Sequence, residues 1–209
     1  IIIIQQTNIL FAALLCTAMH VYEHSCQKKH TKATSKSKFR IYQLSSLYMD
    51  DEDTDTYVTI VRHGQTHWNN ELRLQGWKDE EGCQLTKEGL LQARALGARF
   101  EREKAHFDVV YSSDLGRALA TMQLAIERLN IKPSRIKIDK RFRERSFGKF
   151  EGITKPLLAE RFSREWSRMK SGDPSWKAEG GESATQVKLR AWEALMEIIA
   201  KNRGKSICS

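Results

Sequence analysis

Apolar residues recur along most of this chain in two alternating patterns, one typical of strands and one of helices. Residues 57–61 and 107–113 are short runs rich in β-branched and aromatic side chains, as in buried strands. Between them, residues 86–104 carry apolar positions at nearly helical period, with Thr86 as the candidate N-cap. Residues 114–129 return to the helical period. This order of elements is typical of a parallel sheet with crossover connections.

The remaining residues continue the pattern. Residues 135–138 alternate polar and apolar side chains, which predicts a third strand, and a basic loop follows at residues 140–149. Residues 156–170 and 182–202 are predicted to be helical, and residues 205–209 have the composition of the opening of another strand. We therefore expect a three-layer α/β/α sandwich in which helices cover both faces of a mainly parallel sheet.

The first 54 residues differ in composition from the rest. They open with four isoleucines and an apolar run at residues 9–18, whereas residues 23–56 are polar, rich in lysine, serine and threonine, and acidic at residues 50–55. We expect residues 1–54 to form a disordered or poorly ordered tail and residues 55–209 to form the domain. The apolar run is too short to span a membrane and lacks a basic segment before it, so a secretory signal has little support. An untranslated leader explains it equally well.

Charge narrows the classes of partner. The net charge is +9, and the excess of lysine and arginine lies in residues 57–209. A basic domain suits an anionic small substrate, although a solvated basic surface gives the same composition. No helix-turn-helix, zinc-finger or RNA-binding sheet motif is present, so we expect no nucleic-acid partner, and we expect no membrane partner. The sequence does not predict an oligomeric state.

Cysteine and histidine spacing bears on location and metal binding. The four cysteines form no CxxC pair, which favours a reduced, cytoplasmic setting. His20, His24, Cys26 and His30 have spacings that could place ligands together, but zinc sites normally come with a folded module around them. We therefore expect no metal.

The first residues able to perform chemistry follow the first predicted strand. Residues 57–61 deliver Arg62, His63 and Gly64 to the carboxyl end of that strand. Open α/β sheets bind their ligands beyond this edge, where an imidazole and a guanidinium beside a flexible glycine can meet an anion. The pattern favours a phosphate site with a nucleophilic histidine.

Two further segments are expected at the same edge. Arg117 begins the helix after the second strand, where its guanidinium can bind phosphoryl oxygens together with backbone N–H groups. Glu144 lies between Arg143 and Arg145 in the basic loop, where a carboxylic acid could protonate a leaving oxygen. Two alternatives stay open: Arg117 is a surface arginine, and Glu144 pairs with one of its neighbouring arginines.

Taken together, these segments resemble the histidine phosphatase superfamily, the phosphoglycerate-mutase-like enzymes, over residues 57–209. The matching segments are Arg-His-Gly-x-Thr-x-x-Asn at 62–69, Ser-Ser-Asp-Leu-x-Arg-Ala-x-x-Thr at 112–121, Glu-Arg-x-Phe-Gly-x-x-Glu-Gly at 144–152 and Gly-Gly-Glu-Ser at 180–183. The resemblance implies the phosphoglycerate-mutase-like fold, here incomplete at its C-terminus.

The resemblance also implies a role for each site residue. His63 would attack phosphorus and become a phosphohistidine, with a backbone carbonyl holding its other ring nitrogen. Arg62 and Arg117 would bind the phosphoryl oxygens, and Asn69 would be an added donor. Glu144 would act first as the acid and then as the base that activates water. No metal or other cofactor is implied, because the arginines supply the positive charge.

The family places a second histidine just after the strand that follows the last long helix. This sequence stops at Ser209, at the opening of that strand. We therefore expect the polypeptide to lack one phosphate ligand, to be weakly active or inactive, and to be marginally stable.

The expected reaction is hydrolysis of a phosphomonoester of a small phosphorylated metabolite. Residues 151–154, Glu-Gly-Ile-Thr, resemble the phosphatase branch more than the mutases, which carry a Gly-Leu-Asn-Lys type segment. A sugar bisphosphate such as fructose-2,6-bisphosphate is a candidate substrate. The alternatives are phosphoryl transfer of the phosphoglycerate mutase type, a non-catalytic phosphate-binding protein and a metal-dependent hydrolase.

Overall fold

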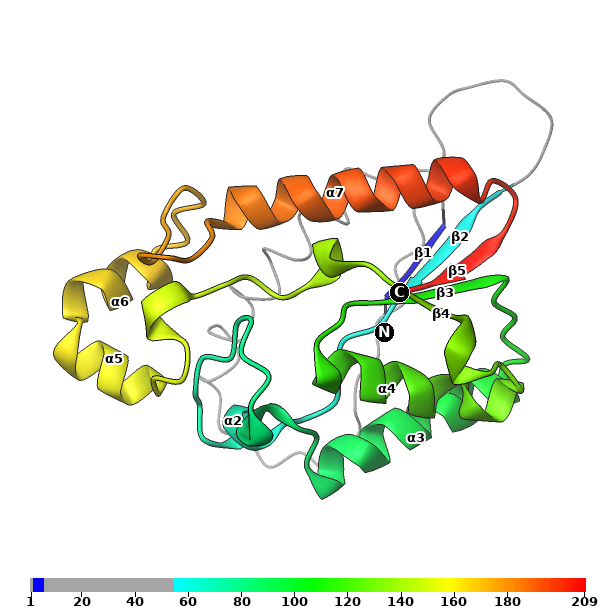
Figure 1. The fold of residues 1–209 in the computed structure, drawn as a ribbon, viewed down its shortest axis with the longest axis horizontal. Coiled ribbons are helices and arrows are strands. Elements are labelled where there is room, and N and C mark those ends of the chain that lie inside the picture. The colour runs from blue at the N-terminus through cyan, green and yellow to red at the C-terminus, as the bar shows by residue number, and fades with distance from the viewer. Residues whose placement is uncertain (1, 6–54) are drawn as a thin grey trace, which may run out of the picture.

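A computed structural model describes residues 2–5 and 55–209, and these form one sheet with helices on both sides (Figure 1). The sheet has the strand order β1-β2-β5-β3-β4, in which β2, β5, β3 and β4 are parallel and β1 is antiparallel to β2. The strands are β1 (Ile2–Gln5), β2 (Tyr57–Ile60), β3 (Val109–Ser112), β4 (Ile136–Ile138) and β5 (Ser206–Cys208).

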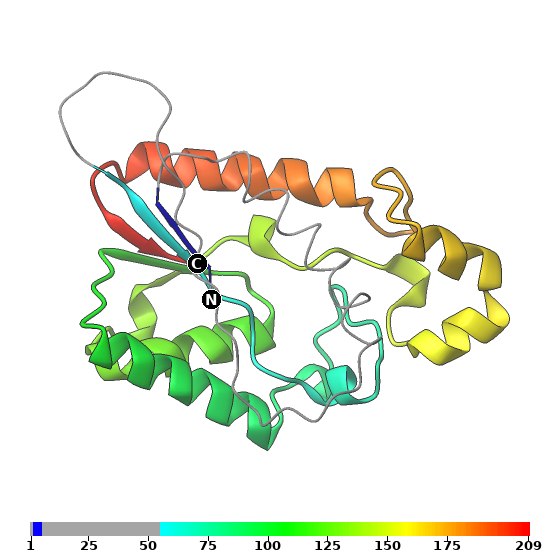
Figure 2. The ribbon, with the colours of Figure 1, turned by 180° about the vertical axis from the view of Figure 1, so that it is seen from behind.

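Three long helices make the outer layers. α3 (Lys87–Arg102) and α4 (Gly116–Ile126) cover one face of the sheet, and α7 (Ala184–Lys201) covers the other, as the two opposite views show (Figures 1 and 2). The three-layer α/β/α sandwich and the mainly parallel sheet are therefore confirmed.

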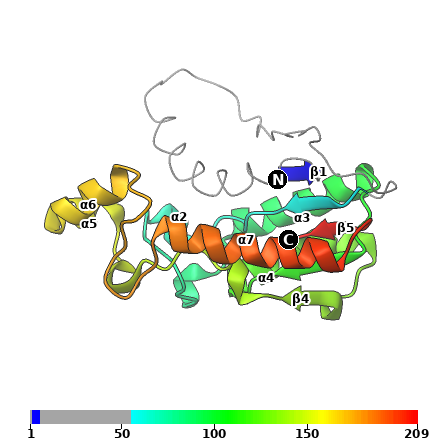
Figure 3. The same cartoon turned by 90° about the horizontal axis from the view of Figure 1, so that it is seen from above.

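Shorter helices lie beyond the sheet. Figure 3 shows α5 and α6 at one end of the molecule, away from the strands. These helices are α2 (His67–Asn70), α5 (Lys155–Arg161) and α6 (Ser163–Lys170), and the 3-10 helices are η2 (Glu81–Cys83), η3 (Glu127–Leu129), η4 (Pro133–Arg135), η5 (Lys140–Phe142) and η6 (Gly148–Phe150).

Alternate residues of β3 serve the two apolar layers of the sandwich. Val110 packs in a cluster with Phe100 of α3 and Ile126 of α4, on one side of the sheet. Val109 packs in a second cluster with Ile198 of α7, on the other side. Because successive side chains of a strand point to opposite faces, a strand covered on both sides is apolar at nearly every position. This explains the unbroken apolar run that marked β3 in the sequence.

A third apolar cluster lies under α5, at the end of the molecule away from the strands. Leu74, Phe147, Phe150 and Leu158 are buried there with Trp176. The cluster joins the loop after α2 to the loop that contains residues 144–152. It therefore fixes the relative position of two loops that reach the carboxyl edge of the sheet.

The helix boundaries follow local capping chemistry. The predicted N-cap of α3 is confirmed, because the Thr86 hydroxyl accepts a hydrogen bond from Gly89 N–H at 3.0 Å. The prediction of one helix over residues 156–170 is wrong. The chain leaves the helical region at Phe162, where φ is −133°, and its ring packs edge-to-face on Phe150 with centroids 5.2 Å apart. Phe162 therefore separates α5 from α6, and its ring packs against the third cluster.

Part of the predicted N-terminal tail lies on the sheet, because residues 2–5 form β1 beside β2. Residues 1 and 6–54 lie outside the described residues, as does the group of histidines and cysteine weighed as metal ligands, so the domain boundary at residue 55 stays a prediction. In the described part of the chain, no helix is both long enough and apolar enough to cross a membrane.

Candidate active site

His63 lies in the loop beyond the carboxyl end of β2 and is half-buried. Its Nδ1 atom is 2.7 Å from the carbonyl oxygen of Gly64. A carbonyl oxygen can only accept, so Nδ1 carries the hydrogen and Nε2 keeps its lone pair. The pKa of His63 is lowered to about 4, chiefly by burial and also by the charges of Arg117 and Arg62, and the Gly64 hydrogen bond offsets part of this lowering. The ring is therefore neutral and nucleophilic at physiological pH.

The loop that carries His63 is held by the N-terminal halves of α3 and α4. A Cβ atom added to Gly64 would lie 2.5 Å from the Gly89 carbonyl oxygen, so the close approach of loop and helix requires glycine. Gly64 N–H donates to Thr121 Oγ1 at 3.0 Å, and this hydroxyl donates to Arg117 O at 2.7 Å. Thr121 thus links the histidine loop to the backbone of the arginine expected to share its phosphate site.

Arg117 is buried, with 1% of its surface exposed, so the alternative of a surface arginine is wrong. Its Nη1 donates to Lys78 O at 3.0 Å, and its Nη2 donates to Gly76 O at 2.8 Å and to Glu144 Oε2 at 2.9 Å. Its Nε is buried without a hydrogen-bond partner. A buried N–H group without an acceptor is unfavourable, so this atom is suited to bind an anionic ligand.

Glu144 is brought to the same site by its loop. Burial raises the pKa of its carboxyl group, and the positive charges of Arg117 and Arg62, with the Arg117 hydrogen bond, offset only part of that rise. A raised pKa favours the protonated form that a general acid needs. Since Arg62 also acts on the pKa of His63, the charged groups of this site influence both the nucleophile and the acid.

The alternative in which Glu144 pairs with a neighbouring arginine is wrong. Arg143 instead binds both oxygens of Asp114, at 2.6 and 2.5 Å. Arg145 donates from Nε to Glu182 O at 2.8 Å and from Nη2 to Trp176 O at 2.9 Å. Arg143 and Arg145 therefore bind other groups, and the carboxylate of Glu144 forms its ion pair with Arg117.

Asn69 has a structural task in addition to its expected role. It forms a capping box with Thr66 at the start of α2: its Oδ1 accepts from Thr66 N–H at 3.0 Å, and its own N–H donates to Thr66 Oγ1 at 3.1 Å. The cap uses the acceptor oxygen, which orients the amide and is compatible with an amide N–H donor for phosphate. The role of Asn69 in phosphate binding stays a prediction.

Asp79 contacts the start of α4, and no sequence pattern points to this contact. Gly116 N–H, at the start of α4, donates to Asp79 Oδ1 and Oδ2 at 3.0 and 2.9 Å. A carboxylate at this position accepts hydrogen bonds from the first N–H group of the helix, and its negative charge interacts favourably with the positive end of the helix dipole. The backbone N–H expected to meet phosphate at this position is therefore bonded to a side chain 37 residues earlier, a contact that no local pattern announces.

Glu151 joins two loops of the site. Its Oε1 accepts hydrogen bonds from Trp77 N–H at 3.0 Å, from Ser146 Oγ at 2.9 Å and from Phe147 N–H at 2.9 Å. Gly76 has a φ of +57°, and a Cβ added there would lie 2.1 Å from the same oxygen. Glu151 belongs to the third matching segment, so a signal for it existed, whereas none marked Trp77.

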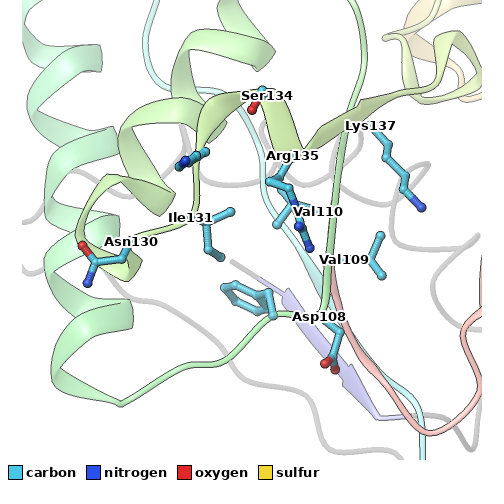
Figure 4. A pocket seen from close by; sticks show the side chains of 10 residues that line it. Asp108, Val109, Val110, Asn130, Ile131, Ser134, Arg135 and Lys137 are labelled. Atoms are coloured by element: carbon cyan, nitrogen blue, oxygen red, sulfur yellow. The ribbon is translucent and has the colours of Figure 1, made fainter.

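The described residues hold no group of three or more His, Cys, Asp or Glu side chains that could bind a metal ion. Both cysteines in that part of the chain, Cys83 and Cys208, are buried free thiols. A groove of about 610 Å³ lies at the amino ends of β3 and β4 (Figure 4). None of the five predicted site residues lines it, so the candidate active site and the groove are separate.

Comparisons with known proteins identify the family of this chain. The chain belongs to the histidine phosphatase superfamily (branch 1), whose family model matches residues 58–209. The 2,3-bisphosphoglycerate-dependent phosphoglycerate mutase of Azorhizobium caulinodans is 35% identical over 140 residues, which cover 65% of each protein. The chain thus matches slightly under two thirds of the length of that mutase.

Two solved structures are similar in fold. YhfR of Bacillus stearothermophilus has a TM-score of 0.65 and 32% identity, covering 73% of this chain and 72% of that one. A mycobacterial glucosyl-3-phosphoglycerate phosphatase in complex with VO3 has a TM-score of 0.60 and 28% identity, covering 71% of this chain and 72% of that one.

Proposed function

We propose that this protein is a metal-independent phosphomonoesterase that acts through a phosphohistidine on His63. The observation that carries the proposal is the state of the His63 ring: Nδ1 donates to the Gly64 carbonyl, and the low pKa leaves Nε2 with a lone pair. A neutral imidazole beside the positive charges of Arg62 and Arg117 is suited to attack a phosphoryl group that those charges attract.

In the first step, Nε2 of His63 attacks phosphorus and the bond from phosphorus to the leaving oxygen breaks. Glu144, whose raised pKa favours the protonated form, would give its proton to the leaving oxygen, so that an alcohol departs. The phosphorylated ring keeps its Nδ1 hydrogen on Gly64 O, which stabilises the positive charge of the intermediate. The guanidinium groups of Arg62 and Arg117 would stabilise the charge on the phosphoryl oxygens.

In the second step, the Glu144 carboxylate takes a proton from a water molecule whose oxygen attacks phosphorus. The phosphorus–nitrogen bond breaks, inorganic phosphate leaves, and His63 returns to its neutral form. Glu144 is then protonated and ready for another turnover. The ion pair between Glu144 and Arg117 supports this exchange, because a nearby cation stabilises the carboxylate that forms halfway through the cycle.

The proposed substrate is a small phosphorylated metabolite, with sugar bisphosphates as candidates. The similar proteins include both a phosphatase and a mutase, so they support phosphoryl chemistry without selecting between the two outcomes. The segment Glu-Gly-Ile-Thr at residues 151–154 favours hydrolysis. In a mutase, the phosphohistidine would instead have to survive until a second metabolite accepts the phosphoryl group.

A single-turnover experiment with an aryl phosphate tests the proposal. We expect an acid-labile, base-stable phosphoprotein that is insensitive to chelator, is lost in His63→Ala and is retained in His106→Ala, whose side chain is 78% exposed. Reversible phosphate binding without labelling would instead support the non-catalytic phosphate binder. Loss of turnover with chelator would support the metal-dependent hydrolase, and transfer to an added phosphoglycerate rather than to water would support the mutase.

A further inference from the structure

We propose that Arg190 of α7, held by Glu182, is a positioning residue for Glu144 and sets how well the leaving oxygen is protonated. This inference rests on the proposed function of Glu144 as the general acid. Arg190 lies in the N-terminal half of α7, Glu182 lies two residues before that helix begins, and their side chains are 17% and 16% exposed.

All five N–H groups of the Arg190 guanidinium are used. Nε and Nη2 bind the two carboxylate oxygens of Glu182, at 2.7 and 2.8 Å. The other three donate to backbone carbonyl oxygens of the loop: Nη1 to Arg141 O at 2.7 Å and to Arg143 O at 2.8 Å, and Nη2 to Glu144 O at 2.9 Å. The bidentate ion pair with Glu182 thus orients the Arg190 guanidinium, and its other N–H groups hold residues 141–144.

Glu182 holds the same loop from its other side. Its Oε2 also accepts from Ser146 N–H at 3.0 Å, and its backbone carbonyl accepts from Arg145 Nε at 2.8 Å. Burial raises the pKa of Glu182, but the hydrogen bonds from Arg190 and Ser146 and the nearby arginine charges outweigh this and leave it below its ordinary value. The Glu182 side chain therefore stays charged, and the ion pair persists at neutral pH.

The Glu144 backbone is fixed from two elements at once. Its carbonyl oxygen accepts from Arg190 Nη2 at 2.9 Å and from Trp77 Nε1 at 2.8 Å, so both acceptor positions are occupied. The Glu144 side chain, in contrast, is bonded to Arg117, which must also serve the phosphoryl group. The backbone contacts are therefore what can hold the acid in place while Arg117 binds substrate.

A positioning role predicts a selective defect. Proton transfer requires the acid within hydrogen-bond reach of the leaving oxygen, and a shift of about 1 Å can cost roughly a hundredfold in rate. A good leaving group such as 4-nitrophenolate departs without a proton, whereas an alkoxide does not. A displaced Glu144 should therefore slow alkyl phosphates far more than 4-nitrophenyl phosphate.

The experiment compares Arg190→Lys and Trp77→Phe with the unsubstituted chain, on an alkyl phosphate and on 4-nitrophenyl phosphate. Trp77→Phe removes one donor to the Glu144 carbonyl at a position that is 41% exposed, so folding is expected to survive. Arg128→Lys, in an exposed ion pair with Glu101, is the matched control. We expect single-turnover rates on the alkyl phosphate to fall roughly tenfold to a hundredfold, with less than about threefold change on 4-nitrophenyl phosphate and none in the control.

Equal slowing of both substrates in Arg190→Lys and Trp77→Phe would overturn the positioning role, because a general loss of structure does not distinguish leaving groups. Unchanged rates on both substrates would overturn it as well. Failure of the proposed function looks different: the unsubstituted chain would then form no phosphohistidine from 4-nitrophenyl phosphate. That result would remove the role of Glu144 and with it that of Arg190.

Discussion

Oε2 of Glu144 lies 2.9 Å from Nη2 of Arg117, in an ion pair whose arginine side chain is inaccessible to solvent and whose glutamate side chain is 31% exposed. The pair joins the loop of residues 140–149 to the start of α4. It places the proposed acid directly against the proposed phosphate ligand. Because burial raises the pKa of Glu144 and Arg117 lowers it, binding of an anion beside Arg117 should raise that pKa further and favour the protonated acid.

Glu144→Gln tests the acid. The amide keeps the size of the side chain and can still accept from Arg117, but it cannot supply a proton. We expect phosphoryl transfer from an alkyl phosphate to fall by about a hundredfold or more, and transfer from 4-nitrophenyl phosphate to change far less. Single-turnover rates on the two substrates measure this difference. An equal loss on both would remove Glu144 from the acid role.

Arg117→Lys tests the buried guanidinium. Lysine keeps the charge but not the fork that binds Gly76 O, Lys78 O and Glu144 together. We expect phosphoryl transfer to His63 to fall by about a hundredfold, and the free energy of unfolding to fall by roughly 1–3 kcal/mol because buried carbonyls lose their donors.

The control for this substitution is Arg94→Lys, which alters an exposed arginine whose nearest partner oxygen, on Glu127, is 4.0 Å away. Urea unfolding and single-turnover labelling are compared for the two variants, which both keep a positive charge and both lose the guanidinium group. If Arg117→Lys behaves like Arg94→Lys, the guanidinium has no special part in the site.

The pH dependence of stability tests the environment of His63. Its pKa is lowered from 6.5 to about 4, chiefly by burial, so between these values the unfolded chain binds a proton that the folded chain does not. The free energy of unfolding must therefore fall as the pH drops from about 6.5 towards 4, by at most about 3 kcal/mol from this group. Other groups titrate in this range, so His63→Ala is the reference. Urea unfolding should show the unsubstituted chain losing more stability than His63→Ala between about pH 7 and pH 4.5, and parallel losses would contradict the low pKa.

Gly64→Ala tests the packing that aims His63. The added Cβ would lie 2.5 Å from Gly89 O, so the loop must move, and we expect a loss of about 1–3 kcal/mol in stability together with loss of phosphohistidine formation. Gly172→Ala is the contrasting variant, because nothing lies within 4 Å of its Cβ position and its cost comes only from a φ of +77°. Thermal unfolding and labelling should separate the two. Normal labelling in Gly64→Ala would show that the loop tolerates displacement.

Structural features that depend on residues close together in the sequence could be predicted. The Thr86 cap and the strand at Val109–Ser112 followed from local period and capping chemistry. Placing His63 and Arg117 at one edge needed only the rule that parallel strands end together. The break at Phe162 could not be predicted in this way, because the packing of its ring on Phe150 exists only in the folded molecule.

Contacts between residues that are far apart in the sequence could not be predicted from the pattern. Arg143 and Arg145 adjoin Glu144 in the sequence, which favours them as its partners, but in the folded chain Arg143 pairs with Asp114. Arg190 was one basic residue among many on a predicted helix, and its three carbonyl partners lie 46 to 49 residues earlier. Which donor meets which carbonyl depends on packing that no local period encodes.

The most direct test of this account is to identify the nitrogen atom that carries the phosphoryl group after a single turnover with an aryl phosphate. Nδ1 of His63 is occupied by the Gly64 carbonyl, so the account predicts phosphorylation on Nε2 alone, detected by nuclear magnetic resonance of the trapped phosphoprotein. Phosphorylation on Nδ1, on another residue, or on none would contradict it.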